Sequence, residues 1–95
     1  MITKFTEHCV ICNREVEEIH HLCFGRGIRP LADADGLTAP ICRICHSELH
    51  HNTIANELSK ICGQLLFEKN LIEKEGISGD EARDRFRERY SRSYL

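Results

Sequence analysis

The sequence predicts a small α+β domain in which a zinc-stapled β-hairpin and the helix after it are joined to a helical C-terminal half. Residues 13–41 separate two Cys-x-x-Cys pairs, Cys9–Cys12 and Cys42–Cys45. Apolar runs of the strand type flank a segment rich in Gly, Pro and Asp. The second half has no proline and spaces its apolar residues as a helix does. We expect one domain over residues 1–95, made of a compact module at 9–51 and a helical extension at 52–95.

Length and composition favour a metal-stapled intracellular protein. At 95 residues a hydrophobic core alone gives marginal stability, so an internal staple is expected. Six cysteines could form three disulfides, but the first residues lack the basic start and the apolar run of a secretory peptide. No apolar run approaches the ~18 residues that span a bilayer. We therefore expect a soluble, cytoplasmic protein in a reducing compartment, without a membrane partner. A net charge of -2 excludes binding of nucleic acid by overall charge, although not by a local basic cluster.

The elements of the first half follow from local patterns. Residues 9–15 have the form of a zinc knuckle, a tight turn in which two cysteines reach one ion. Residues 16–24 alternate loosely and suit a short strand. Residues 25–36 indicate an irregular loop, because Gly, Pro and Asp are frequent there. Residues 37–41 would be the returning strand, and a helix should begin close to Cys42.

The second half indicates two helices. The first spans residues 53–75 and carries an apolar stripe at steps of three, four or seven: Ile54, Leu58, Ile61, Leu65 and Ile72. Gly76 supplies a left-handed stop. Ser78 and Glu81 fit a capping box, which opens a last helix of about 12 residues before a loose tail at 91–95. We expect the stripe to pack against the module or against a second copy, giving a homodimer through the C-terminal helices.

The two cysteine pairs predict a structural zinc site. Zinc in such sites takes four tetrahedral ligands, and a Cys-x-x-Cys pair reaches adjacent corners with little strain, so the two pairs complete the shell. The alternative is that the pairs are coincidental and hold buried thiols; a thioredoxin-like redox role is weaker, because no βαβ pattern surrounds them. Of the remaining cysteines, Cys62 lies in the apolar stripe and is expected in the core. Cys23 suits either the core or a spare ligand position.

The histidines point to a second metal. His46 and His50 are four residues apart on the expected helix, so both imidazoles project from one face. A third ligand must come from elsewhere, and the pair His20-His21 at a strand end is the obvious donor. Because adjacent strand residues point to opposite sides, one histidine can bind metal while the other is free as a base. This arrangement suits phosphodiester hydrolysis, whereas ordinary surface histidines are the alternative.

The run Glu18–Leu22, a Gly-containing loop, residues 40–46 and then His50 resemble the HNH endonucleases of the ββα-metal (His-Me finger) class. The resemblance covers residues 9–51 and is closest to the small zinc-stabilised versions common in phages and mobile elements. It implies a DNA endonuclease with His21 as general base. It also implies a divalent ion (Mg²⁺, Mn²⁺, Ni²⁺ or Zn²⁺) on three histidines: His20, His46 and His50.

One position departs from this family. Its middle asparagine, which tethers the loop and helps to orient the base, usually lies nine residues before the first helix histidine, and here that position is Leu37. The residues that could substitute for it are Asp33, Asp35 and Thr38. The departure and the acidic pI favour an alternative function, a non-catalytic zinc module that binds nucleic acid or a partner protein. A third interpretation is an assembly factor with two structural ions.

Basic residues supply the expected contacts to substrate. Arg26 and Arg29 lie in the loop beside the expected site and can hold phosphates by bidentate hydrogen bonds, or they are ordinary solvated residues. Five arginines between residues 83 and 92 alternate with acidic residues. Such a mixed face is typical of solvated ion pairs, and direct DNA contact is the alternative.

Overall fold

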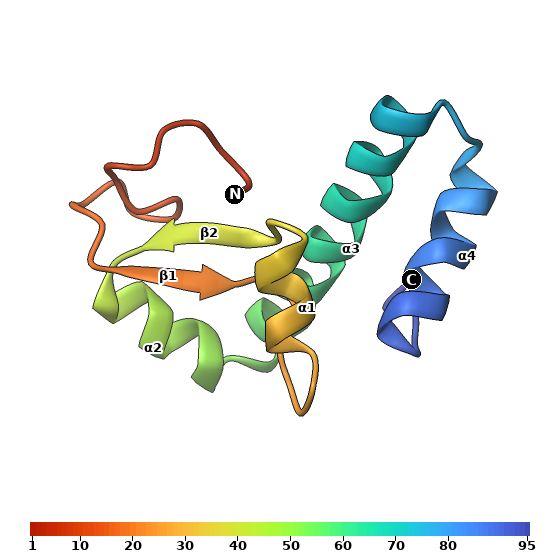
Figure 1. Cartoon of the computed structure of the whole chain (residues 1–95). Helices are drawn as coiled ribbons and strands as arrows, with labels where there is room; N and C mark the ends of the chain where they lie inside the picture. The colour runs from red at the N-terminus through yellow and green to blue at the C-terminus, as the bar shows by residue number, and fades with distance from the viewer.

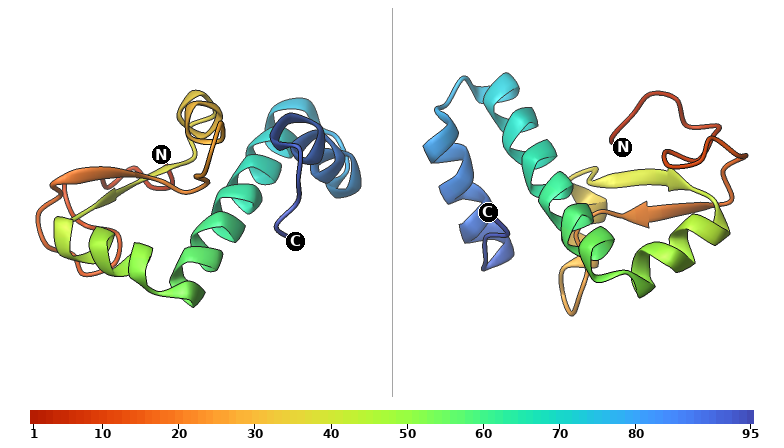
Figure 2. Two further views of the ribbon diagram at one scale, coloured as in Figure 1. Left: turned by 90° about the horizontal axis from the view of Figure 1, so that it is seen from below. Right: turned by 180° about the vertical axis from the view of Figure 1, so that it is seen from behind.

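The computed structural model describes residues 1–95, which form a two-stranded sheet and four helices in an α+β arrangement. The elements follow the chain in the order β1 (Glu18–His21), α1 (Arg29–Ala34), β2 (Thr38–Ile41), α2 (Arg43–His51), α3 (Thr53–Glu75) and α4 (Gly79–Tyr90). In Figure 1, α2 runs along the hairpin, α3 leads away from it and α4 returns beside α3, and the two views of Figure 2 agree. None of the helices has both the length and the apolar composition that a membrane span needs.

The two strands form the expected antiparallel hairpin. Glu18 pairs with Ile41 and His21 with Thr38, so β1 is shorter than the 16–24 segment expected from the sequence. The prediction of a returning strand before Cys42 is confirmed. Every residue of β2 is buried, whereas β1 buries His20 and exposes Glu18 and Ile19. The hairpin therefore presents the inward side of β1 to the helices.

The segment between the strands is not wholly irregular, and that expectation was wrong. It contains the short helix α1, with Pro30 in its first turn. Proline breaks the middle of a helix but is favourable at the start, where its fixed φ suits the helix and its missing N–H needs no partner. Ala32 is completely buried and packs α1 into the core. Gly36 (φ +70°) turns the chain from α1 into β2.

The later helices begin and end where the sequence indicated. Cys42 caps α2, and its sulfur accepts the Cys45 N–H at 3.4 Å. The left-handed Gly76 ends α3, and the Ser78 hydroxyl accepts the Glu81 N–H at 3.1 Å to begin α4. Only this half of the expected capping box forms, because the Glu81 carboxylate pairs with Arg85 instead.

The apolar stripe of α3 does not pack into the core, which corrects the prediction that it covers the module; the alternative, packing against a second copy, stays a prediction. Ile54 is 73% exposed, Leu58 53% and Leu65 47%. The buried positions of this helix are instead small or polar: Ser59, Gly63, Gln64 and Glu68. Cys62, expected in the core, is also exposed, whereas Cys23 is fully buried and donates to the Lys60 carbonyl at 3.6 Å.

Aromatic residues of α4 provide the main packing instead. Phe86 and Tyr90 stack with ring centroids 4.3 Å apart and belong to the same buried cluster as Leu22, Leu37 and Ala39 of the hairpin region. The Tyr90 hydroxyl donates to Asp35, just after α1, at 2.6 Å. The module and the helical extension therefore share one hydrophobic core.

The N-terminal segment lies along the outer edge of β2. Ile2 N–H donates to the Thr38 carbonyl at 2.7 Å, and Val10 N–H donates to the Pro40 carbonyl at 2.9 Å. Pro40 has no N–H, but in a strand its N and its carbonyl lie on the same edge. The residue without a donor thus faces away from β1, and the ladder between the strands loses no hydrogen bond.

Candidate metal centres

The two cysteine pairs meet in one cluster. The sulfurs of Cys9, Cys12, Cys42 and Cys45 all lie within 4.8 Å of one another. The first pair is presented by the knuckle, in which Cys9 accepts the Asn13 N–H at 3.0 Å and Asn13 adopts a left-handed φ of 66°. The second pair is presented by the first turn of α2. A segment of turn and a helix N-terminus thus bring four sulfurs to one point, and the cluster can hold a structural metal ion such as zinc.

The thiols show why a cation suits this cluster. Burial acts to raise the pKa of Cys9, but the backbone N–H groups of Cys12 and Cys42 outweigh it and lower the pKa to about 6. Burial and then the neighbouring thiols, that of Cys42 foremost, raise the pKa of Cys45 to about 12. Four thiolates cannot coexist at this distance without a positive charge among them. A zinc ion would supply that charge and would be held by the deprotonated sulfurs.

The three predicted histidine ligands also converge. Nitrogens of His20, His46 and His50 lie within 4.8 Å of one another, and the group can hold a metal ion. His20 comes from the inward side of β1, and the other two come from successive turns of α2, with ring centroids 4.9 Å apart. The two candidate sites share α2, which carries two cysteines at its N-terminus and two histidines further along.

The hydrogen bonds of His20 determine which nitrogen is free. Its Nε2 lies 2.7 Å from the Ser59 hydroxyl, and that hydroxyl donates its only proton to the Leu22 carbonyl at 2.8 Å. Ser59 must therefore accept from His20 Nε2–H, which leaves Nδ1 with the lone pair. Burial, followed by the charges of His46 and His50, lowers the pKa of His20 to about 4. The ring is neutral at neutral pH, as a metal ligand must be.

His46, like His20, has a hydrogen-bond acceptor at one ring nitrogen. Its Nδ1 donates to the Glu18 carboxylate at 2.8 Å, so Nε2 carries the lone pair. Metal-bound histidines usually donate the second ring N–H to a carboxylate or another acceptor, which fixes the ring and raises its basicity. Two of the three histidines have such a partner, and burial lowers the pKa of the third, His50. The donor set and its supports fit a divalent cation.

His21, the residue assigned as general base, lies beside these three histidines. All four line one hollow of about 170 Å³, here called the histidine hollow, together with Ile19, Phe24 and Arg29. The His21 side chain is 13% exposed, and its Nε2 donates to Asp33 on α1 at 3.0 Å. Asp33 is one of the three substitutes suggested for the asparagine. Leu37, which stands at the asparagine position, is completely buried in the core.

The two arginines assigned to substrate occupy different places. Arg29 lines the histidine hollow, whereas Arg26 lines a neighbouring hollow of about 660 Å³. Phe24 lines both, and its ring lies edge-on to His50 with centroids 4.8 Å apart. His8 lies in the knuckle, where its backbone bridges to Glu15, and His51 donates to the Ser47 carbonyl on its own helix.

Sequence reasoning missed the residues that support the histidines. Glu18 precedes His20 by two residues on a strand and so lies on the same face, a signal that could have identified it. Asp33 is among the three substitutes that the sequence suggests for the asparagine, but the sequence does not indicate which of them contacts His21. Ser59 had no local signal, because it reaches His20 across 39 positions of the chain from the middle of α3. Phe24 was assigned only to a strand.

These features define the class of the protein: a small α+β domain in which a four-cysteine cluster adjoins a cluster of histidines. The chain belongs to the family described as Protein of unknown function (DUF968), whose model matches residues 3–77. The match includes both clusters and α3, while α4 and the tail lie outside it. A search of the curated proteins found no match, and neither did a search of the solved structures.

Proposed function

We propose that the protein is a metal-dependent endonuclease of the HNH type, with a ββα-metal module, that hydrolyses phosphodiester bonds of DNA. The observation that carries the proposal is the meeting of His20, His46 and His50 beside His21 in one hollow. Three ligands to one ion, with a fourth histidine outside the ligand set as a base, suit metal-assisted hydrolysis. The order of these residues along the chain is also the order that the HNH resemblance implies.

In this proposal His21 removes a proton from water. Asp33 accepts the hydrogen bond from Nε2–H of His21, so Nδ1 is the atom that can take a proton from water. The water oxygen then bonds to phosphorus as the bond to the departing sugar oxygen breaks. Arg29, which lines the same hollow, holds a non-bridging phosphate oxygen. A divalent cation bound by the three histidines would neutralise charge on the phosphate and on the departing oxygen.

The four-cysteine site has a separate, structural task. A zinc ion on these sulfurs would join the knuckle to the start of α2, and α2 carries two of the three histidine ligands. The alignment of the hydrolytic site thus depends on the structural ion, although that ion is not part of the reaction.

The test is a plasmid-nicking assay with Mg²⁺, Mn²⁺ or Ni²⁺, with and without a chelator, on the parent protein and on His21→Ala. Loss of a general base typically costs 10²- to 10⁴-fold in rate, and we expect a loss in that range. The matched control is His8→Ala, because His8 lies outside the histidine hollow and its side chain is exposed. Circular dichroism and zinc content should be equal in all three proteins. A folded His21→Ala protein that nicks at the parent rate would overturn the assignment.

A second candidate function is a non-catalytic zinc module that binds nucleic acid or a partner protein. It is favoured by Leu37, because a buried aliphatic side chain cannot perform the orienting role of the family asparagine. A mobility shift of DNA without any metal-dependent nicking would select this candidate over the nuclease.

A further inference from the structure

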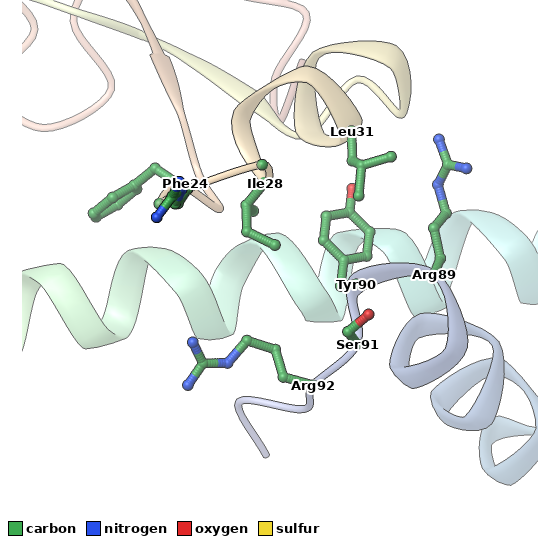
Figure 3. Close-up of a pocket in the computed structure, with 10 residues that line it drawn as sticks. Phe24, Ile28, Leu31, Arg89, Tyr90, Ser91 and Arg92 are labelled. Atoms are coloured by element: carbon green, nitrogen blue, oxygen red, sulfur yellow. The ribbon is translucent and has the colours of Figure 1, made fainter.

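The hollow next to the histidines is unusually rich in positive charge. This arginine hollow, of about 660 Å³, is lined by Arg26, Arg89 and Arg92 together with Phe24 and Tyr90 (Figure 3). No aspartate or glutamate lines it or the histidine hollow, although the whole chain has a net charge of -2. Because Phe24 lines both, the two hollows adjoin. Three carboxylates approach them from behind the lining residues: Asp33 pairs with His21, Glu18 with His46, and Asp35 with Arg89.

Ion pairing distinguishes two of the three arginines of the arginine hollow from most other arginines, while the third, Arg89, pairs with Asp35. Five arginines have carboxylate partners within 4.0 Å: Arg43, Arg83, Arg85, Arg87 and Arg89. Arg26 and Arg92 have none. Lys60, on α3, is also unpaired, and its Nζ lies 4.9 Å from the centre of the Phe24 ring and 6.0 Å from that of Tyr94. Lys60 thus lies over the Phe24 ring, Arg26 and Arg92 line the same hollow as Phe24, and the Arg92 guanidinium lies 5.1 Å from the centre of the Tyr94 ring.

The tail that carries Arg92 is held in place, contrary to the loose tail expected from the sequence. Gln64 on α3 is completely buried; its amide donates to the Ser93 hydroxyl at 3.0 Å, and its carbonyl accepts the Tyr94 N–H at 2.7 Å. Ser91, with a left-handed φ of 60°, turns the chain away from α4. Figure 3 shows Arg92 and Arg89 on opposite sides of Tyr90, with Arg92 on the same side as Phe24. A fixed tail gives Arg92 a defined position, which a recognition residue needs.

We propose that Arg26, Lys60 and Arg92 form a second phosphate-binding site, which holds the backbone of the DNA strand whose scissile phosphate lies in the histidine hollow. The inference rests on the proposed nuclease function and adds the path of the substrate across the protein. Each strand of duplex DNA carries a negative charge about every 3.4 Å along the helix axis. With one phosphate in the histidine hollow, the neighbouring phosphates of that strand therefore lie over the walls of the hollow. Phe24 is the wall next to these cations, and an aromatic ring beside a basic groove also suits an unstacked base.

The experiment measures DNA binding separately from cleavage. Fluorescence anisotropy of a labelled DNA oligonucleotide is recorded without added divalent ions, in the His21→Ala background, over a series of salt concentrations. The test variants are Arg92→Ala and Lys60→Ala. Lys69→Ala is the control, because Lys69 is also an unpaired lysine of α3 but lies nine residues further along, on the opposite face of the helix.

We expect each test variant to bind DNA about 5- to 10-fold more weakly at low salt and to lower the salt slope by about one. Lys69→Ala should match its parent. Unchanged affinity in Arg92→Ala, or an equal loss in the control, would overturn the inference. Inorganic phosphate added at constant ionic strength should not displace the DNA; displacement at low millimolar concentration would show a site for free phosphate and would also overturn it. Because binding is read without cleavage, failure of the nicking assay leaves this result interpretable.

Discussion

Ser59 determines the orientation of His20. It is 6% exposed. Its hydroxyl accepts the hydrogen bond from the imidazole and donates to the Leu22 carbonyl, so it connects α3 to His20 of β1 and to the residue just after that strand. A serine in the middle of a helix usually contributes little to stability, but both hydrogen bonds of the Ser59 hydroxyl are buried. The ring of His20 therefore cannot rotate or change tautomer without leaving a buried group unpaired.

Ser59→Ala should weaken metal binding at the histidines. The substitution removes the partner that fixes His20, and loss of such a supporting contact typically costs 10- to 100-fold in metal affinity. It also leaves the Leu22 carbonyl without this donor, at a cost of about 1 to 3 kcal/mol in the free energy of unfolding. Calorimetric titration with Ni²⁺ or Mn²⁺ and urea unfolding measure the two effects. Ser47→Ala, an exposed serine on α2, should change neither.

At the scale of single elements, α3 shows how much the sequence could and could not predict. Its bounds, its stop at Gly76 and the cap of α4 follow from local signals and are confirmed. The prediction of its buried face was wrong, because the residues that cover the face lie far along the chain. Glu68 is 8% exposed in its side chain since Arg83 reaches it from α4 at 3.0 Å, and Gln64 is covered by the tail. Helical spacing shows which residues share a face of the helix, but not which face the rest of the chain buries.

The clusters of the site divide in the same way. Four cysteines and three histidines were predictable, because ligand spacing on a turn, a strand and a helix directly reports which atoms can meet. Of the partners of the histidines, Glu18 follows from the strand period, whereas the contacts of Ser59 and Asp33 depend on how α3 and α1 dock. Local signals do not predict the helix α1, because a proline such as Pro30 is typical of loops as well as of the first turn of a helix.

Gly63 of α3 lies against Leu22 and Cys23, the residues that follow β1. A Cβ at this position would lie 2.5 Å from the sulfur of the buried Cys23 and 3.1 Å from Leu22 Cβ. We expect Gly63→Ala to lower the free energy of unfolding by about 1 to 3 kcal/mol, the usual cost of overpacking, despite the better helix propensity of alanine. Urea unfolding gives the value. Gly79→Ala, where the Cβ meets nothing within 4 Å, should be neutral or slightly stabilising, and Cys23→Ala should restore part of the loss in Gly63→Ala.

At the scale of the whole molecule, stability is divided between two hydrophobic clusters. The larger one joins the hairpin, α1 and the aromatic residues of α4. The smaller one consists of Cys9, Ile41, Cys42 and Leu49, so half of its members are sulfur ligands. A four-residue cluster contributes little by itself, and the structural ion should therefore stabilise this end of the molecule.

Loss of the four-cysteine site should unfold that end first. Cys12→Ala removes one ligand, and because zinc binding to such sites contributes on the order of 10 kcal/mol, we expect a loss of several kcal/mol, about 3 or more. Thermal melting with measurement of bound zinc tests this expectation. Cys62→Ser is the matched control, since Cys62 is an exposed thiol outside the cluster and should retain both zinc and melting temperature. Equal melting temperatures for Cys12→Ala and the parent would contradict a structural role for the cluster.

The hydrogen bonds from Ile2 and Val10 to β2 also bear on self-association. A two-stranded sheet has two edges, and strands of other chains can add to an uncovered edge. Here the first residues of the chain cover the outer edge of β2, and Pro40 lacks an N–H donor on the same edge. The opening segment thus covers part of the outer edge of β2, and we expect that removing Ile2 with its neighbours would expose Thr38 to strand addition by other chains.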